Sequence, residues 1–119
     1  MLNKQDFINA IYQDIDIVKG DTLAFNFQLK GLNGVEPAFK FSCKDNPEGE
    51  TYFTSESPDG ITLEDYDEVK DIATYSVYIA PAKTKGLELA RYYYDLQMTL
   101  EDDIYTLMRG RFTLLYEIS

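Results

Sequence analysis

Apolar and polar residues alternate along several short stretches of the chain, and this alternation is its clearest structural signal. In residues 22–30 the large apolar side chains share one parity, and polar or small ones take the other: Leu23, Phe25, Phe27 and Leu29. A period of two is typical of a strand with one buried face. Further predicted strands cover 38–44, 51–54, 61–63, 72–80, 92–100 and 104–118. Turn signals rich in Gly, Pro and Asp separate these segments, which favours an antiparallel sandwich over a parallel α/β sheet.

Two segments depart from the strand pattern. Phe7, Ile8 and Ile11 fit a helical stripe while residues 11–17 also alternate, so we expect a short helix to about residue 10 and a strand from about 12 to 18. Pro81 opens a segment compatible with one helical turn before the penultimate strand. The sequence therefore predicts one all-β domain over residues 1–119, an antiparallel immunoglobulin-like β-sandwich in which 1–10 form an N-terminal extension.

Three consecutive tyrosines, Tyr92, Tyr93 and Tyr94, begin one of the predicted strands. Neighbouring side chains in a strand point to opposite faces. Tyr92 and Tyr94 share the parity of the apolar residues at 96, 98 and 100, so we expect them in the core with their hydroxyls bonded near the sheet edge. Tyr93 is expected on the outer, polar face.

The last two predicted strands are expected to form a hairpin around residues 101–103. Both strands carry apolar residues at even positions, and a three-residue loop that pairs Leu100 with Ile104 keeps all of these on one face. Even positions from Ile104 to Ile118 are then expected to face the core. Gly110 interrupts this series, and a glycine inside a strand often marks a bulge or bend.

The same register arranges the outer face of the hairpin. Asp95 is expected opposite Arg109, where an exposed ion pair would specify the register, and Tyr93 is expected opposite Arg111, where a cation–π contact would form. This face is the candidate partner surface, and its residues are Tyr93, Tyr105, Leu107, Arg109 and Arg111.

Composition and charge limit the classes of partner. The chain is 45% hydrophobic and 27% charged, which is typical of a globular domain. With 21 acidic and 11 basic residues its formal charge is −10, so phosphate backbones and anionic membranes are repelled and neither nucleic acid nor membrane is expected as a partner. No segment is apolar enough to cross a bilayer, and the N-terminus lacks the apolar core of a signal peptide.

Little in the sequence supports catalysis. There is no histidine, and Cys43 is the only cysteine, which excludes disulfides within the chain, zinc sites built from Cys and His, and His-based triads. The acidic clusters at 64–68 and 101–103 do not have the spacing of an EF-hand and are interpreted as solvated charge. We therefore expect no catalytic residues, metal or cofactor. Exposed tyrosines such as Tyr78, Tyr93 and Tyr105 leave sugar stacking open.

Three segments in order resemble a phage family: "VKGDTLAFNFQL", "AFKFSCK" and "YSVYIAPAKTKGLELARYYYDLQMTLEDDIYTLMRGRFTLL". They are similar to the small β-sandwich domains of phage and prophage tail or baseplate proteins in Gram-positive bacteria, and most of all to the N-terminal domain of the baseplate upper protein. The resemblance covers about residues 15–118, and the residues that match its motifs are Gly20, Asp21, Thr84, Tyr92, Tyr94, Asp95, Gly110 and Phe112.

This resemblance implies assembly rather than turnover. The expected protein is a non-enzymatic structural component of a phage tail or baseplate, made in the bacterial cytoplasm and incorporated into the virion, with copies of itself and other tail or baseplate proteins as partners. The apolar stripe of Phe7, Ile8 and Ile11 is the candidate oligomer contact. The alternatives are a carbohydrate-binding module and a small cytoplasmic interaction or inhibitor protein.

Overall fold

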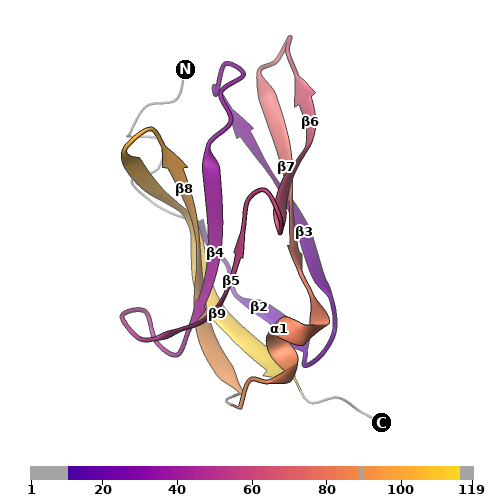
Figure 1. The fold of residues 1–119 in the computed structure, drawn as a ribbon, viewed down its shortest axis with the longest axis vertical. Helices are drawn as coiled ribbons and strands as arrows, with labels where there is room; N and C mark the ends of the chain where they lie inside the picture. The colour runs from indigo at the N-terminus through magenta and orange to yellow at the C-terminus, as the bar shows by residue number, and fades with distance from the viewer. Residues whose placement is uncertain (1–10, 89, 116–119) are drawn as a thin grey trace.

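Two β-sheets packed against each other make up most of the protein (Figure 1), seen in a computed structural model that describes residues 11–88 and 90–115. The larger sheet has the strand order β1-β9-β8-β4-β5, with β2 also paired to β9, and the smaller sheet has the order β3-β7-β6. The elements are β1 (Ile11–Tyr12), β2 (Ile15–Val18), β3 (Leu23–Lys30), β4 (Ala38–Lys44), β5 (Thr51–Glu56), β6 (Ile61–Asp67), β7 (Ile72–Ile79), α1 (Pro81–Lys85), β8 (Arg91–Leu100) and β9 (Asp103–Leu115). The predicted all-β fold with two layers is confirmed.

The N-terminal strand is divided in two. Both β1 and β2 run parallel to β9, with Ile11 beside Met108 and Ile15 beside Phe112. Residues 13 and 14 separate the two parts, where the sequence predicts one continuous strand. The predicted helix before residue 11, with Phe7 and Ile8, lies outside the described residues.

Aromatic rings fill the space between the sheets. Phe41 of β4 lies at the centre, with its ring stacked on Tyr94 at 5.1 Å and on Phe53 at 6.2 Å between centroids. Phe25 and Phe112 approach the same ring edge to face at 6.4 and 6.1 Å. Edge-to-face and offset arrangements of this kind add stability beyond the burial of apolar area. The core therefore joins the two sheets through rings from β3, β4, β5, β8 and β9.

The division of the three tyrosines agrees with the alternation of the sequence. Tyr92 and Tyr94 are buried, at 1% and 3% exposure, and Tyr93 is partly exposed on the opposite face. Each inward tyrosine pairs across the hairpin with an inward residue of β9, Tyr92 with Phe112 and Tyr94 with Gly110.

The hairpin of β8 and β9 follows the predicted register over only half of its length. Leu96 lies opposite Met108, and the two outward pairs are those expected, Asp95 with Arg109 and Tyr93 with Arg111. Towards the loop the register shifts by one residue, so that Leu100 pairs with Asp103 and not with Ile104. The predicted three-residue loop is therefore wrong: only residues 101 and 102 lie outside the paired strands, and Glu101 has a positive φ of 58°.

A β-bulge at Leu107 explains the shift. Leu96 pairs with Met108 but Gln97 pairs with Thr106, which leaves Leu107 as an extra residue on β9. Between the bulge and the loop, the odd-numbered residues of β9 face the core and the even-numbered ones face outward, the reverse of the prediction. Ile104, expected in the core, is 64% exposed, while Leu107 is only 8% exposed.

The bulge also corrects the candidate partner surface. Tyr105 lies opposite the buried Met98 and packs against the core, so its predicted outward position is wrong, as is that of Leu107. The prediction that even-numbered residues face the core assumed continuous strand pairing. An extra residue in one strand reverses the predicted face of every residue beyond it.

Gly110 does not mark the bulge; it makes room for the break in the N-terminal strand. The Gln13 N–H donates to the carbonyl of Arg109 at 2.9 Å, and the Gln13 carbonyl accepts a hydrogen bond from the Tyr94 hydroxyl. A Cβ at position 110 would overlap that carbonyl oxygen. The φ of Gly110 is not among the positive values. Glycine is therefore required here for space and not for backbone conformation.

We expect Gly110→Ala to destabilise the protein because the added methyl group must displace the Gln13 carbonyl. The cost should be about 1–3 kcal/mol of unfolding free energy, as for overpacking in a core. Gly86→Ala is the matched control, since a Cβ there meets nothing within 4 Å and φ is −86°. Urea unfolding followed by circular dichroism compares the two variants. Equal stabilities would show that the N-terminal strand does not depend on the absence of a side chain at position 110.

Candidate binding surface on the larger sheet

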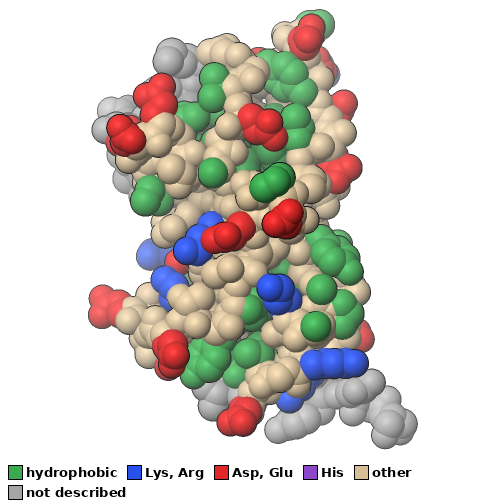
Figure 2. Space-filling view, in the orientation of Figure 1, with side chains coloured by type: hydrophobic (Ala, Val, Ile, Leu, Met, Phe, Trp, Pro, Cys, Tyr) green, Lys and Arg blue, Asp and Glu red, His purple; other side chains and the backbone are tan. Residues whose placement is uncertain are grey.

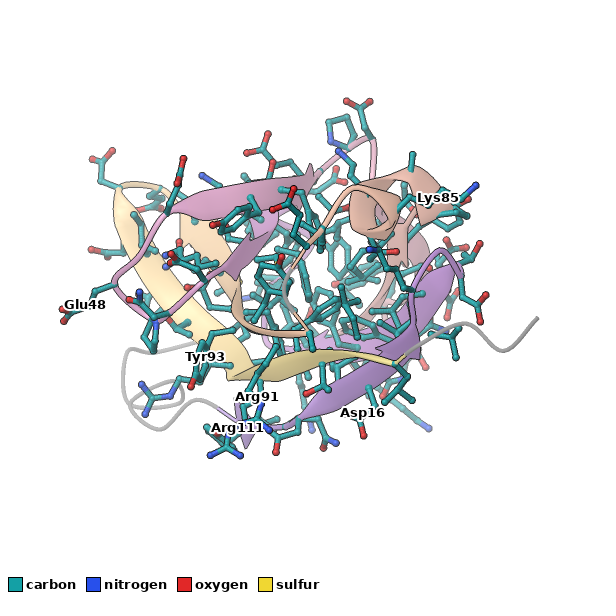
Figure 3. The ribbon with its side chains drawn as sticks, turned by 90° about the horizontal axis from the view of Figure 1, so that it is seen from below. Asp16, Glu48, Lys85, Arg91, Tyr93 and Arg111 are labelled. Atoms are coloured by element: carbon teal, nitrogen blue, oxygen red, sulfur yellow. The ribbon has the colours of Figure 1, made fainter. Side chains whose placement is uncertain are left out.

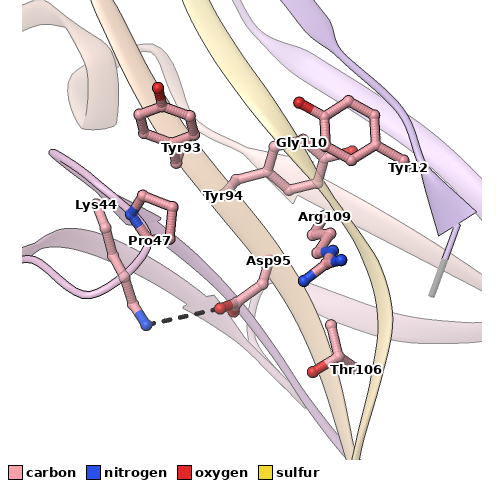
Figure 4. A pocket seen from close by; sticks show the side chains of 9 residues that line it. All are labelled: Tyr12, Lys44, Pro47, Tyr93, Tyr94, Asp95, Thr106, Arg109 and Gly110. Carbon is pink, nitrogen blue, oxygen red and sulfur yellow. Dashed lines mark ion pairs between the residues drawn. The ribbon is translucent and has the colours of Figure 1, made fainter. Parts of the chain in front are cut away.

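A shallow pocket lies on the outer face of the larger sheet. Its volume is about 290 Å³, and its lining residues are Tyr12, Lys44, Pro47, Tyr93, Tyr94, Asp95, Thr106, Arg109 and Gly110. Tyr12 and Tyr93 lie on two sides of it, with Arg109 and Thr106 between and below them (Figure 4). The pocket combines aromatic surface with charged groups, a composition typical of contact surfaces on proteins.

Strand pairing explains why these side chains meet. Across the outer face, Lys44 of β4 lies beside Tyr93 of β8, and Tyr93 lies beside Arg111 of β9. In the next row Asp95 lies beside Arg109, which in turn lies beside Tyr12 of β1. Residues paired across neighbouring strands share a face, so four strands contribute to one surface.

Asp95 pairs with a different cation from the one predicted. Its Oδ2 lies 3.6 Å from Nζ of Lys44, and both side chains are largely buried, at 21% and 25% exposure. No ion pair joins Asp95 to Arg109 within residues 11–88 and 90–115, although the two lie opposite each other. The carboxylate is thus neutralised from β4, and the Arg109 guanidinium keeps its charge in the pocket. The Asp95 Oδ1 is buried without a hydrogen-bond partner in the described structure.

The structure brings together three of the five residues predicted for the partner surface. Tyr93, Arg109 and Arg111 share the outer face, and Arg91 joins them there (Figure 3). Tyr105 and Leu107 are directed to the core side by the bulge. Sequence reasoning missed Tyr12, Lys44, Pro47 and Thr106. The outward parity of Lys44 in its alternating segment was a usable signal, whereas nothing local indicated where Tyr12 would lie.

Of the three residues of the predicted oligomer contact, only Ile11 belongs to the described part of the chain. Ile11 is 64% exposed at the end of β1, close to Tyr12, which is 60% exposed. Phe7 and Ile8 lie outside the described residues.

Most of the residues matched to motifs in the sequence analysis hold the fold together. Thr84, completely buried, accepts a hydrogen bond from the backbone N–H of Gly20 at 2.9 Å through its Oγ1. These residues are 64 positions apart, so the bond joins the loop before β3 to α1. Gly20 has a φ of 88°, which favours glycine. Tyr94 and Gly110 form the second such contact, around Gln13.

Other candidates for chemistry have structural roles. Burial raises the pKa of the Cys43 thiol to about 12, so it is not an activated nucleophile. Asp67 accepts hydrogen bonds from the backbone N–H groups of Val69 and Lys70 in a turn. Among the described residues, no three or more acidic or cysteine side chains are grouped in a way that would hold a metal ion. The described part of the chain also contains no helix with the length and hydrophobicity to span a bilayer.

Comparison of the chain with models of protein families and with curated proteins gives no match.

We expect Thr84→Val to destabilise the protein because it leaves the Gly20 N–H without its acceptor. Removing one partner of a buried bond costs about 1–3 kcal/mol. Thr84→Ser is the matched control, since it keeps the hydroxyl. The measurement is thermal and urea unfolding of both variants. A Val variant as stable as the Ser variant would mean that this bond does not stabilise the contact between α1 and the loop before β3.

The stability of the protein should fall at high pH partly through Tyr94. Burial, with a smaller effect of Asp14, raises the pKa of the Tyr94 hydroxyl from 10.0 to about 12. The folded state therefore holds this proton more tightly than the unfolded state. The resulting stability is fully present below about pH 10 and is lost as the pH rises towards 12.

Tyr94→Phe should be less stable than the wild type at neutral pH, because the Gln13 carbonyl loses its donor. Between about pH 10 and 11.5, however, its unfolding free energy should fall less steeply. Tyr78→Phe, at a 50% exposed position, should keep the wild-type slope. Urea titrations at several pH values make the comparison. Parallel pH profiles for all three proteins would contradict the role of Tyr94.

Proposed function

We propose that this chain is a non-enzymatic structural protein of a phage or prophage tail or baseplate, acting through contacts with copies of itself and with other tail or baseplate proteins. The observation that carries the proposal is the role of the motif residues. Gly20, Thr84, Tyr94 and Gly110 carry the resemblance, and each takes part in a contact between distant segments of this fold. Proteins that have a fold in common would keep residues that make such contacts. Proteins that have a catalytic site in common would instead keep reactive groups in a cleft.

We also assign an immunoglobulin-like topology. The sheet order β1/β2-β9-β8-β4-β5 facing β3-β7-β6 supports this assignment, because it matches a sandwich whose first strand crosses to pair with the last. The short helix α1 lies between β7 and β8, at the edge where the chain passes from the smaller sheet to the larger.

The accessible surface supports contact rather than turnover. Of the large apolar side chains in the described residues, Ile11, Tyr12, Tyr52, Val69 and Ile104 are among those exposed to solvent. Several lie near strand ends and turns, where a neighbouring protein can cover them. The pocket beside Tyr12 holds the Lys44–Asp95 ion pair and an arginine.

A carbohydrate-binding module is the second candidate, and one observation favours it. Tyr12 and Tyr93 lie on two sides of a pocket whose polar residues include Asp95, Thr106 and Arg109. Aromatic rings next to polar side chains are a common arrangement for sugar recognition. A glycan array with Tyr93→Ala as control separates the two functions, since loss of a glycan signal in that variant would favour the module.

The particle itself provides the test of the proposed function. After prophage induction in the bacterium that encodes the chain, density-purified tails or virions should contain it in a fixed ratio to other tail proteins by quantitative mass spectrometry. A soluble cytosolic enzyme of the host is the control for carry-over. If the chain is produced but stays in the soluble fraction with that control, the assignment to the virion is wrong.

A further inference from the structure

The basic residues of this acidic chain are unevenly distributed. All the arginines in the sequence, Arg91, Arg109 and Arg111, lie on the outer face of β8 and β9, and Lys44 of β4 lies in the same surface. Figure 2 shows Lys and Arg side chains at mid-height and at the lower right, while acidic side chains are spread over the view, including its upper end over β6 and β7. In a chain with a formal charge of −10, this face is the exception.

The arginines on this face are available to a partner. Asp95 is paired with Lys44, and Asp14 accepts a hydrogen bond from the backbone N–H of Arg111. Within residues 11–88 and 90–115, neither Arg109 nor Arg111 forms an ion pair. Arg109 also lines a concave site beside tyrosine rings, and its side chain is exposed to solvent. A carboxylate, which arginine binds with two parallel hydrogen bonds, is therefore the matching group.

The end of the β6–β7 hairpin carries the complementary chemistry. The exposed residues of β6 and of the turn that follows it include Glu64, Asp65, Glu68 and Lys70, and Val69 in the turn is 95% exposed. Strand β6 lies at an edge of the smaller sheet in the described structure, and the hairpin extends to one end of the molecule (Figure 1). The hairpin thus presents carboxylates next to an apolar side chain, as the pocket presents arginine next to tyrosine.

We infer that the outer face of β8 and β9 binds the acidic end of the β6–β7 hairpin of a second copy of this chain. Val69 packs against Tyr12 and Tyr93, and the carboxylates of Glu64 and Glu68 pair with Arg109 and Arg111. This inference rests on the proposed function, because it specifies the contact through which copies assemble. The two surfaces differ, so the contact is head-to-tail. In a pair of copies one hairpin and one β8–β9 face stay free, and further copies can bind there to give a ring or a filament.

Charge reversal tests the contact from both sides. The face variant carries Arg109→Glu and Arg111→Glu, and the hairpin variant carries Glu64→Lys and Glu68→Lys; all four positions are exposed. In sedimentation velocity at low salt, each variant alone should associate at least about tenfold more weakly than the wild type. An equimolar mixture should associate again, because each altered surface then meets its complement. Association of the wild type should weaken as salt is raised.

A control variant, Lys83→Glu with Lys85→Glu, makes the same change of charge as the face variant but in α1, which lies at the end of the molecule away from the hairpin (Figure 1). It should associate like the wild type, and circular dichroism checks that every variant is folded. Unchanged association of the face variant, or a mixture that stays dissociated, would overturn the inference. A wild type that remains monomeric would overturn it too, but would leave the particle test untouched. If the wild type instead binds an acidic glycan through Arg109, the surface recognises a different partner and the inference is wrong.

Discussion

The packing of aromatic rings between the two sheets is the constraint on which the rest of the structure depends. Phe41 contacts rings from four other strands, with centroid distances between 5.1 and 6.4 Å. A large ring has few ways to fill the space between sheets, so each strand must present its ring at the right height and on the inner face. Near these rings, therefore, the strand register is fixed. Tyr92 and Tyr94 belong to this layer, which is why they lie inside while Tyr93 lies outside.

Farther from the aromatic rings the strand register is less strictly determined, as the pairing of β8 with β9 shows. Its pairing is regular from Arg91 to Leu96, next to the rings, and shifts only beyond that point. The bulge at Leu107 buries Leu107 and brings Tyr105 against the core, while Ile104 is left exposed. Arg109 remains outside because it lies on the regular side of the bulge. A local irregularity thus increases apolar burial without turning a charged residue inward.

The same packing determines what the protein can offer to partners. Because the inner faces take the apolar side chains, the outer face of the larger sheet collects Lys44, Tyr93, Asp95 and Arg109. A rigid sheet holds such side chains in fixed positions, which lowers the cost of ordering them on binding. The broken N-terminal strand adds Tyr12 to this surface and is itself attached through Gln13. The proposed assembly role therefore depends on a face built by several strands and not on a single loop.

By itself, the sequence determined the two-layer all-β fold, most of the strands and the faces of Tyr92, Tyr93 and Tyr94. These follow from alternation, which is a local property of a strand. It also placed Asp95 opposite Arg109, since pairing in a hairpin involves residues that are close in the chain. Only the tertiary structure decided that Asp95 pairs with Lys44, that Gly110 makes room for Gln13, and that Leu107 forms a bulge. The first two depend on a residue from a third strand, and the bulge buries Leu107 in the core. The spacing of side chains along one strand carries no information about such neighbours.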